Sequence, residues 1–512
     1  MQKIIELKLL PAEAADENIL PELIARAAGE RREDVTGFHL LKRSIDARAR
    51  QPRILLTIQV FIGEPFTETK QALVVFPNVS RADKQVLIIG AGPAGLFAAL
   101  RLIEKGIRPV LLERGKDVRA RRRDLAALNK DGVINPESNY CFGEGGAGTY
   151  SDGKLYTRST KRGDVNRILR LLVQFGADHN ILIDAHPHIG TNKLPQIIQA
   201  MRQQITDSGG LFLFEKKVVD FVLHDQQIKG VKTADGEIYD GSAVILATGH
   251  SARDIFRLLH RKGILIEAKP FALGVRIEHP QPLIDHIRYG IPSNYLPPAA
   301  YSLVEQVGGK GVFSFCMCPG GIIAPASTDD GELVVNGWSP SRRNNPFANS
   351  GIVVTVEEKD MLPFQKEGPL MGLAFQQAVE QKAYAAGGGR FVAPAQRMAD
   401  FANSRPSADL PACSYLPGLH SVPLKDVLPG FIYEDLRRAF VIFGEKMKGY
   451  FTNEAIVVAT ESRTSSPVRI PRDPHTLRHP QISNLFPCGE GAGYAGGIVS
   501  AAMDGEKVAD RV

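Results

Sequence analysis

Two cysteines with one residue between them, Cys316 and Cys318, stand in the stretch FSFCMCPGG (313–321) of a chain with five cysteines among 512 residues. Such a pair could form a redox disulfide, supply metal ligands or pack as small apolar side chains. On a regular strand Ser314, Cys316 and Cys318 would share a face, with the thiols roughly 6.5–7 Å apart. A disulfide needs Cβ atoms about 3.5–4.5 Å apart, so a thiol relay is disfavoured. Two interpretations stay open: buried core thiols, or one wall of a ligand pocket.

A metal site and a membrane location are not expected. His186 and His188 could join the two cysteines, but structural zinc sites use paired ligands at wider spacing. The odd, sparse set of cysteines points to a reducing compartment. The N-terminal stretch lacks the layout of a signal peptide, and the apolar stretches are too short to span a bilayer. We therefore expect a cytoplasmic protein without a metal.

The strongest chemical pattern is the stretch QVLIIGAGPAG (85–95), in which Gly90, Gly92 and Gly95 have the spacing G-x-G-x-x-G. This spacing alone is weak evidence, but an apolar strand pattern, Val86–Ile89, precedes it and a helical pattern follows at once. Gly90 allows a tight turn, Gly92 lets a pyrophosphate approach the backbone, and Gly95 lets the helix pack closely on the strand. The pattern predicts a dinucleotide site.

The elements after the glycines complete this unit. The helix would begin at Pro93 and Ala94, where free N–H groups and a partial positive charge suit phosphates. A second strand pattern, Arg108–Leu112, ends in Glu113 and Arg114. Glu113 stands where an acid can accept hydrogen bonds from a ribose diol, which argues against a 2′-phosphate on that ribose.

Two later stretches favour FAD over NAD. After a meander of strand patterns, the first at Leu211–Phe214 and the second at Val218–Leu223, comes SAVILATGH with Ala247, Thr248 and Gly249. A strand ending in A-T-G resembles the second conserved segment of the glutathione-reductase-like flavoproteins, where the chain passes the dinucleotide. The resemblance implies cofactor contacts in this region, Val218 included.

The stretch NLFPCGEGAGYAGGIVSAAMDG (484–505) resembles the third segment of those flavoproteins. The resemblance implies that Glu490, after Gly489, bonds the ribityl chain or nearby hydroxyls; the family usually has aspartate there. A helix starting near Gly497 and Ile498 would direct its N-terminus at the flavin N1–C2=O edge. Its dipole suits the negative charge of a reduced flavin.

We expect FAD to be the one built-in dinucleotide. The glycine spacing recurs at Gly491, Gly493 and Gly496, but no strand ending in an acid follows it. The sequence therefore predicts no internal nicotinamide domain. An external NAD(P)H, or another diffusible electron donor or acceptor, would complete the redox cycle.

Six stretches resemble one group, the bacterial FAD-dependent dehydrogenases of largely unassigned substrate, related to the glutathione-reductase and fumarate-reductase flavoproteins. They are CFGEGGAGTYSDGKL (141–155), HIGTNKL (188–194), FALGVRIEHPQ (271–281), FCMCPGG (315–321), ESRTSSPVRIPRD (461–473) and PCGEGAGYAGGI (487–498). The resemblance runs from about Val86 to the C-terminus. It implies cofactor and architecture, whereas the substrate has to be argued from the site.

The first of these stretches is a glycine-rich loop, too polar and flexible for a core strand. Gly146 and Ala147 permit close backbone approach to a flat or anionic ligand, and Ser151, Asp152 and Lys154 add a hydroxyl, an acid and a cation. In related flavoproteins the comparable loop lies along the isoalloxazine, which implies flavin contacts here and makes Lys154 a candidate catalytic residue. A plain surface loop is the alternative.

Arg463 is a further candidate catalytic residue beside the cysteines and the lysine. It precedes three hydroxyl residues in ESRTSSPVRI, a combination apt for a carboxylate or for the flavin pyrimidine. The same groups could equally cap a strand end and cross-link loops, and both interpretations stay open.

The elements that must position these residues indicate an α/β protein. Residues 83–265 and 456–512 are expected to form a discontinuous Rossmann-like FAD/NAD(P)-binding domain, with an inserted mixed α/β substrate domain at 266–455. Residues 1–80 predict a small N-terminal α+β domain, either a docking module or a structural appendage. The interface between FAD and substrate domains is the expected place for a small-molecule substrate.

The composition is that of an ordinary soluble protein, and the 62 basic and 56 acidic residues give a net charge of +6. The densest basic run, RARRR (119–123), is expected to be a solvated helix face, so no nucleic-acid partner is predicted. The leading prediction is a flavin-dependent oxidoreductase that exchanges hydride between FAD and a small organic substrate. The alternatives are a flavin-dependent RNA-modifying enzyme and an FAD-bound electron carrier or binding protein. The oligomeric state is left unknown.

Overall fold

A five-stranded parallel sheet organises the part of the protein expected to bind FAD, called the FAD-binding part below, in the computed structural model, which describes residues 1–49, 51–68, 72–157, 163–291 and 293–512. Its strands are β4 (Gln85–Ile89), β5 (Arg108–Leu112), β6 (Leu211–Leu213), β10 (Ala243–Leu246) and β21 (Leu485–Pro487). They pair in the order β21-β10-β4-β5-β6, all parallel. The central strands are rich in Val, Ile and Leu because both faces of the sheet are covered.

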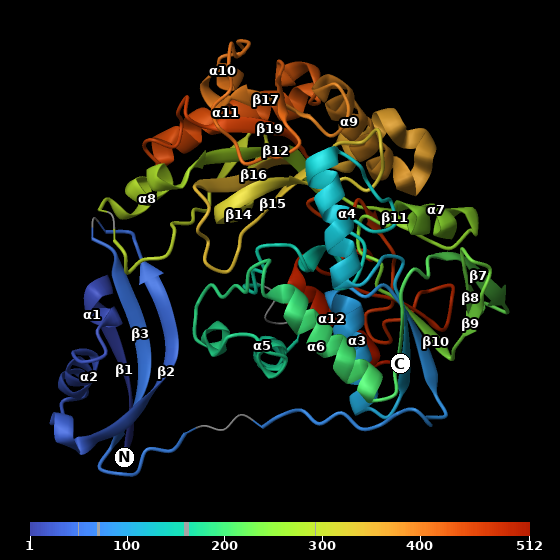
Figure 1. Ribbon diagram of the computed structural model, residues 1–512. Coiled ribbons are helices and arrows are strands. Elements are labelled where there is room, and N and C mark those ends of the chain that lie inside the picture. The colour runs from blue at the N-terminus through green and yellow to red at the C-terminus, as the bar shows by residue number, and fades with distance from the viewer. Residues whose placement is uncertain (50, 69–71, 158–162, 292) are drawn as a thin grey trace.

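Helices pack on one face of this sheet and a meander on the other. The first face carries α3 (Pro93–Glu104), α5 (Val165–Gln174), α6 (Leu194–Asp207) and α12 (Ile498–Ala509). The second carries α7 (Arg253–Arg261) and the antiparallel strands β7 (Val218–His224), β8 (Gln227–Thr233) and β9 (Ile238–Asp240). α3 and α12 lie side by side (Figure 1). They pack so closely at Gly505 that a Cβ there would lie only 2.1 Å from the Ala94 carbonyl oxygen. The first and last helices of the FAD-binding part therefore meet near the glycine motif.

A larger mixed sheet forms the inserted part. Its strands are β12 (Phe271–Pro280), β13 (Val304–Val307), β14 (Lys310–Pro325), β15 (Val335–Trp338), β16 (Phe347–Val356), β17 (Ala393–Arg397), β18 (Leu419–Ser421) and β19 (Ile456–Glu461). α9 (Met371–Gly387), α10 (Met398–Ala402) and α11 (Gly430–Lys446) cover its outer face, while α8 (Gln281–Tyr289) lies at one end (Figure 1). The inner face looks toward the FAD-binding part. α4 (Val118–Asp131) and the short antiparallel pair β11 (Glu267–Ala268) and β20 (Val468–Arg469) lie between the two parts.

The N-terminal residues form a separate three-stranded sheet. β1 (Gln2–Leu9), β2 (Val35–Asp46) and β3 (Arg53–Ile62) pair antiparallel in the order β1-β3-β2, with α1 (Pro11–Ala15) and α2 (Leu20–Ala28) on one face. Alternate residues of β3, Ile54 to Val60, are buried in its core. An extended segment leads from this sheet to β4 (Figure 1).

Two expectations about the organisation need correction. The substrate domain was expected to end at residue 455, but β19 pairs with β12 and β17 of the large sheet, so the chain returns to the FAD-binding part only after Glu461. The first strand expected in the meander, Leu211–Phe214, is instead β6 at the edge of the parallel sheet. Both errors arise because short apolar strands carry no signal of which sheet they join.

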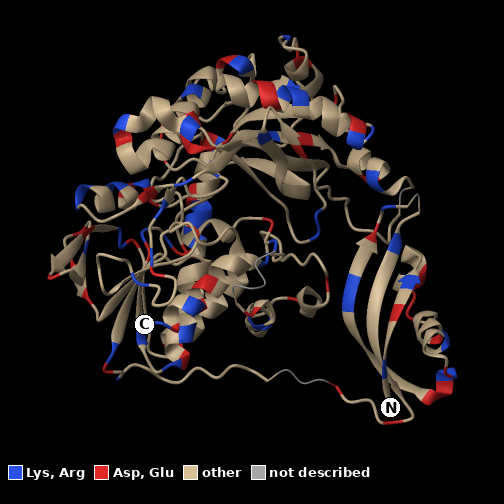
Figure 2. Cartoon of the chain, turned by 180° about the vertical axis from the view of Figure 1, so that it is seen from behind, with Lys and Arg blue, Asp and Glu red and all other residues tan. Residues whose placement is uncertain are grey.

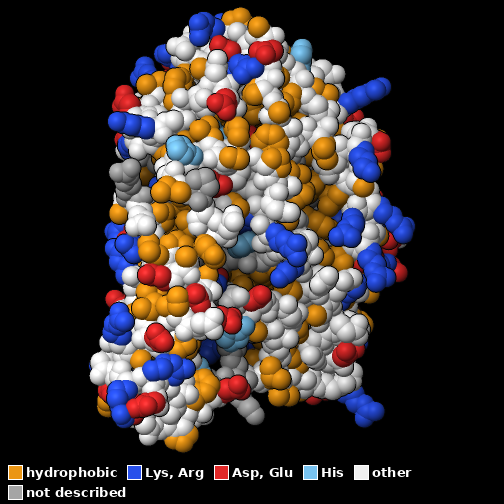
Figure 3. Space-filling view, turned by 60° about the vertical axis from the view of Figure 1, so that its left-hand side comes forward, with side chains coloured by type: hydrophobic (Ala, Val, Ile, Leu, Met, Phe, Trp, Pro, Cys, Tyr) orange, Lys and Arg blue, Asp and Glu red, His pale blue; other side chains and the backbone are white. Residues whose placement is uncertain are grey.

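Charged residues of both signs are distributed over the elements that Figure 2 shows. On the face in Figure 3, lysines and arginines lie among acidic and apolar side chains, several of them close together on the right. The predicted solvated run RARRR is only partly solvated, because Arg121 is fully buried. Within the described ranges, no helix is both long and apolar enough to cross a membrane.

Glu278 on β12 is a buried carboxyl whose titration should affect stability. It accepts hydrogen bonds from the Ser414 amide and hydroxyl, yet burial raises its pKa from 4.5 to about 7. The folded state thus binds this proton more tightly, so its stabilising effect is present below pH 4.5 and is lost as the pH rises to 7.

Glu278→Gln should remove that dependence. Between pH 5 and 8 the free energy of unfolding of the wild type should fall by roughly 1–3 kcal/mol relative to the variant. Urea denaturation across this pH range measures the difference. His279 is present in both proteins, so its effect on stability cancels in the comparison. If the free energies of unfolding of the two proteins changed in parallel with pH, the raised pKa of Glu278 would be contradicted.

Candidate functional site

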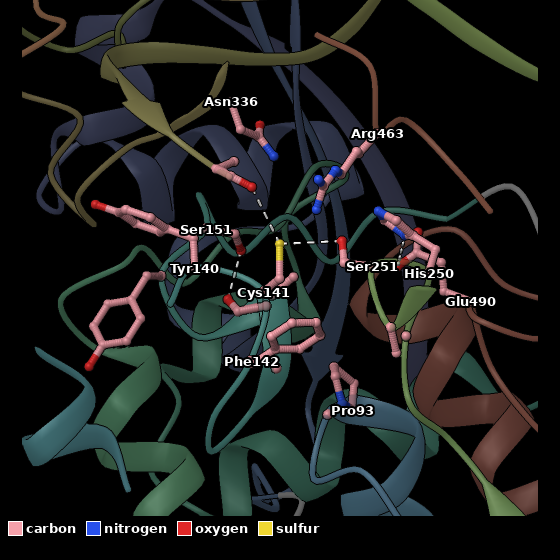
Figure 4. Close-up of a pocket in the computed structure, with 18 of the residues that line it drawn as sticks. Pro93, Tyr140, Cys141, Phe142, Ser151, His250, Ser251, Asn336, Arg463 and Glu490 are labelled. Carbon is pink, nitrogen blue, oxygen red and sulfur yellow. Dashed lines mark hydrogen bonds and ion pairs between the residues drawn. The ribbon is translucent and has the colours of Figure 1, made fainter. Parts of the chain in front are cut away.

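One long cavity runs between the parallel sheet and the inner face of the large sheet. It is lined by the carboxyl ends of β4, β5 and β10, the start of α12, the glycine-rich loop and parts of β14 and β15. In Figure 4 the side chains of Cys141, Ser251, Arg463, His250 and Glu490 surround it. All predicted site residues line this cavity except Gly95 and Gly489.

The glycine motif forms the turn from β4 into α3. Gly90 has a φ of 101°, and a Cβ there would lie 2.5 Å from the Ala247 carbonyl oxygen. A Cβ at Gly95 would lie 2.0 Å from the Gly90 oxygen, so Gly95 serves helix packing rather than ligand contact. Gly92 caps α3 at the cavity and has open space, the nearest atom to its Cβ position being Gly146 Cα at 3.9 Å. The α3 N-terminus is thus open for a phosphate group.

Glu113 lies at the end of β5, as predicted, but its carboxylate has other partners. It accepts hydrogen bonds from the amides of Ala91, Gly115 and Gly143, at 2.9–3.0 Å. A carboxylate offers about four acceptor sites, so one remains for a ribose hydroxyl. Glu113 therefore also joins the phosphate turn to the glycine-rich loop.

Arg121 on α4 holds the glycine-rich loop in place, a role that the sequence reasoning missed. Its five N–H groups donate to the carbonyls of Asn139, Tyr140, Glu144 and Gly146 and to the Thr149 hydroxyl, at 2.8–3.2 Å. Every donor of this fully buried guanidinium is used. The backbone that faces the cavity at Gly146 thus depends on Arg121.

The far end of the cavity, at the carboxyl end of β5, has a set of ion pairs. Arg114 pairs with Glu137 and Asp254 and lies 4.1 Å from the centroid of Phe142, while Lys217 pairs with the same two acids. Val218 lies beside them. Apolar and charged groups together suit the adenosine half of a dinucleotide.

The C-terminal segment reaches the middle of the cavity. Gly497 has a φ of 128° and caps α12, with nothing within 4 Å of its Cβ position, and Ile498 follows at the cavity. Glu490 lies 3.6 Å from His250 Nδ1, and both line the cavity. Gly489 donates its amide to Asp504 at 2.7 Å and does not line the cavity, which corrects its expected cofactor contact. His250 went unnoticed in the sequence because a lone histidine after A-T-G carries no pattern.

Arg463 forms a buried ionic cluster with Arg253, Glu332 and Glu380. It donates to Glu380, Glu332 and the Thr328 hydroxyl at 2.8–3.2 Å, and Arg253 donates to the same two acids at 2.8 Å. Of the two interpretations left open for Arg463, these contacts favour the one in which it cross-links loops, because its guanidinium already donates four hydrogen bonds within the protein. The cluster joins α7 to α9, and so the FAD-binding part to the inserted sheet.

The cysteine pair does not lie on a regular strand. Phe315 pairs with Gly351 and Cys318 with Asn349, so β14 has one extra residue, and Cys316 has a φ of 44°. This bulge places Phe315, Cys316 and Cys318 all at the cavity, while Ser314 turns away and accepts the Leu303 amide. The three residues therefore do not alternate as on a regular strand, which corrects that prediction; both cysteines line the cavity and Ser314 does not.

The two thiols differ in their surroundings. Cys316 is exposed to the cavity, yet the enclosing protein raises its pKa to about 11, which keeps the thiol protonated at neutral pH. Cys318 is buried and donates to the Cys316 carbonyl at 3.2 Å. Lys154 Nζ and Arg276 Nη2 lie 3.7 and 3.5 Å from its sulfur.

Lys154 and Asp152 lie together at the same end. Lys154 Nζ is 3.6 Å from Asp152 Oδ2, which also accepts a 2.9 Å hydrogen bond from Arg343. Burial opposes the charge of Asp152, but Lys154 and Arg343 outweigh it and lower its pKa. Tyr140, Asn336 and Trp338 complete this end. The cavity thus passes from the N-terminus of α3 to a cluster of thiols and charges.

Four family models match the chain: a domain of unknown function at 1–61, an FAD binding domain at 83–127, glucose inhibited division protein A at 194–269, and an FAD-dependent protein C-terminal domain-like family at 270–464. The fold, the phosphate turn and these matches define an FAD-dependent oxidoreductase, with FAD as its cofactor.

An "Uncharacterized protein" of Clostridium beijerinckii is 38% identical across 97% of this chain and 96% of its own length. The chain belongs to the same family as that protein. The tRNA uridine 5-carboxymethylaminomethyl modification enzyme MnmG of Alkaliphilus oremlandii is 45% identical over 49 residues, 10% of this chain and 8% of that enzyme. Among solved structures, L-proline dehydrogenase from P. horikoshii is 14% identical over 85% of this chain and 93% of its own, with a TM-score of 0.34.

Proposed function

We propose that the protein binds FAD along the whole cavity and exchanges hydride between the flavin and a small organic substrate at the end lined by Cys316, Cys318 and Lys154. The observation that supports this is the continuity of one cavity, from the α3 N-terminus to the cysteine bulge. FAD, when bound, supplies hydride transfer at its N5 atom. The rest of the reaction falls to the chain itself.

The chain would bind, orient and protonate. Gly92 and the α3 N-terminus would hold the pyrophosphate, and Glu113 would bind the ribose. The end of α12 at Gly497 would bind the pyrimidine edge of the flavin. The glycine-rich loop, fixed by Arg121, would shield one side of the ring system from water. An external NAD(P)H, or another diffusible donor, would supply the electrons.

Cys316 is the candidate proton donor. Hydride transfer to an unsaturated substrate leaves a site that needs a proton, and Cys316 holds one on Sγ at neutral pH because its pKa is about 11. The substrate can be found by reducing the bound FAD without oxygen and screening small unsaturated compounds for recovery of the oxidised flavin absorbance.

With such a substrate, Cys316→Ser should slow flavin reoxidation about 100-fold, because a serine hydroxyl is a far weaker acid. The positive φ strains serine and cysteine alike, so the fold should be retained. Stopped-flow absorbance measures the rate. Cys413→Ser, outside the cavity lining, is the control; equal rates in both variants would remove Cys316 from the chemistry.

A flavin-dependent RNA-modifying enzyme is the second candidate, favoured by the MnmG similarity and the model match at 194–269. That range includes Val218 and Ala247–Gly249, which line the cavity, so shared FAD binding accounts for the match. Acidic residues lie among the basic ones in Figures 2 and 3, which also argues against an RNA surface. Salt-dependent retention of tRNA on the immobilised protein would favour this alternative. A flavin that no nicotinamide or substrate reduces or reoxidises would favour an electron carrier.

A further inference from the structure

The cysteine end of the cavity has an excess of positive charge. Among the described residues, three cations (Lys154, Arg276 and Arg343) meet two carboxylates there, Asp152 and Glu461. Arg276 is paired with Glu461 at 2.9 Å and Arg343 with Asp152 at 2.9 Å. Lys154 therefore shares Asp152 with Arg343 and has no carboxylate of its own within the described part of the chain.

The contact of Lys154 with a carboxylate is correspondingly long. Its Nζ lies 3.6 Å from Asp152 Oδ2, whereas a charge-assisted N–H···O bond is about 2.7–2.9 Å, and it donates a 3.7 Å hydrogen bond to the Cys318 sulfur. An ammonium has three donors; the Asp152 contact is too long to use one well, and a thiol sulfur is only a weak acceptor. The next carboxyl, Glu278, does not restore the balance, because burial raises its pKa to about 7 and leaves it only partly charged at neutral pH. A partly enclosed cation in this state favours an anionic ligand.

We infer that the substrate carries a carboxylate that pairs with Lys154, attached to a flat apolar body that lies against Phe315 and Trp338. This inference rests on the proposed function and specifies its substrate class. One uncompensated positive charge matches a monoanion such as a carboxylate rather than a doubly charged phosphate. Phe315, Trp338 and Tyr140 line the same end and give the apolar part of the substrate its walls.

The test compares two probes of one shape, benzoate and benzamide, which differ in charge. In the FAD-loaded protein, calorimetry should show benzoate binding at least about tenfold more tightly than benzamide, as expected for a charge-assisted hydrogen bond. Lys154→Met should remove that preference, whereas Lys154→Arg should retain it. Lys193→Met, an exposed lysine outside the cavity lining, should behave as the wild type.

Equal affinities for the two probes, no binding of either, or an unchanged preference in Lys154→Met would overturn the inference. These outcomes leave the proposed function standing if the protein holds FAD. If it holds none, the proposed function fails, and the same titration in the flavin-free protein still tests the carboxylate site. There the emission of Trp338, the one tryptophan of the chain, reports on ligands at this end.

Discussion

Replacing Gly92 by valine should abolish FAD binding while leaving the protein folded. The backbone at Gly92 has φ −74° and ψ −176°, which any residue adopts, and its Cβ position has no neighbour closer than 3.9 Å. The added side chain would occupy the space where the pyrophosphate approaches the α3 N-terminus. We expect the affinity for FAD to fall by more than about 1,000-fold. The free energy of unfolding of the flavin-free protein should change by less than about 1 kcal/mol.

Two other glycines provide controls. Gly430→Val, at the start of α11 with nothing within 4 Å, should keep its FAD, whereas Gly95→Val should prevent folding because its Cβ would lie 2.0 Å from a carbonyl oxygen. Flavin absorbance after desalting and urea denaturation give the two readouts. Normal FAD retention by Gly92→Val would remove the phosphate site from this turn.

Replacing Arg121 by methionine should have the second large effect, on both stability and cofactor. The change removes the arginine donor from four carbonyls and a hydroxyl; Glu144 and Gly146 keep a hydrogen bond from Thr149, whereas the Asn139 and Tyr140 carbonyls lose their donor, at a cost of about 1–3 kcal/mol for each group that water cannot reach. We expect at least about 3 kcal/mol of destabilisation and release of FAD, because the loop at Gly146 loses its anchor.

The neighbouring Arg122 is the matched control. It lies exposed on the same helix, so Arg122→Met should change neither property measurably. Thermal unfolding and flavin content measure both variants. If Arg121→Met retained FAD and wild-type stability, the loop would be held by other contacts, and its assignment as the flavin wall would lose its support.

The dinucleotide unit could be predicted closely from sequence because its signals are local. The strand expected at Arg108–Leu112 has the same bounds as β5. The strand expected at Val86–Ile89 matches β4, which begins one residue earlier, at Gln85. Apolar runs bounded by a glycine turn leave few alternatives. The residues expected to bind FAD follow from the same pattern, and most of them line one cavity.

The parts that were missed depend on distant partners. The inward turn of Arg121 is set by carbonyls at residues 139–146, and nothing in RARRR shows which arginine points inward. The bulge at Cys316 follows from how β14 pairs with Asn349 and Gly351, some 30 residues away. The partners of Arg463, Glu332 and Glu380, come from the inserted sheet and α9. Periodicity and spacing carry no information on such pairings.

The most direct test of the account is a titration of the flavin-free protein with FAD and with FMN, following the emission of Trp338. The N-terminus of α3, Arg114 and this tryptophan all line one cavity. We predict that one FAD per chain quenches the emission, and that FMN, which lacks the adenosine half, binds at least about 100-fold more weakly. No quenching by FAD, or equal binding of the two flavins, would contradict an FAD site along this cavity.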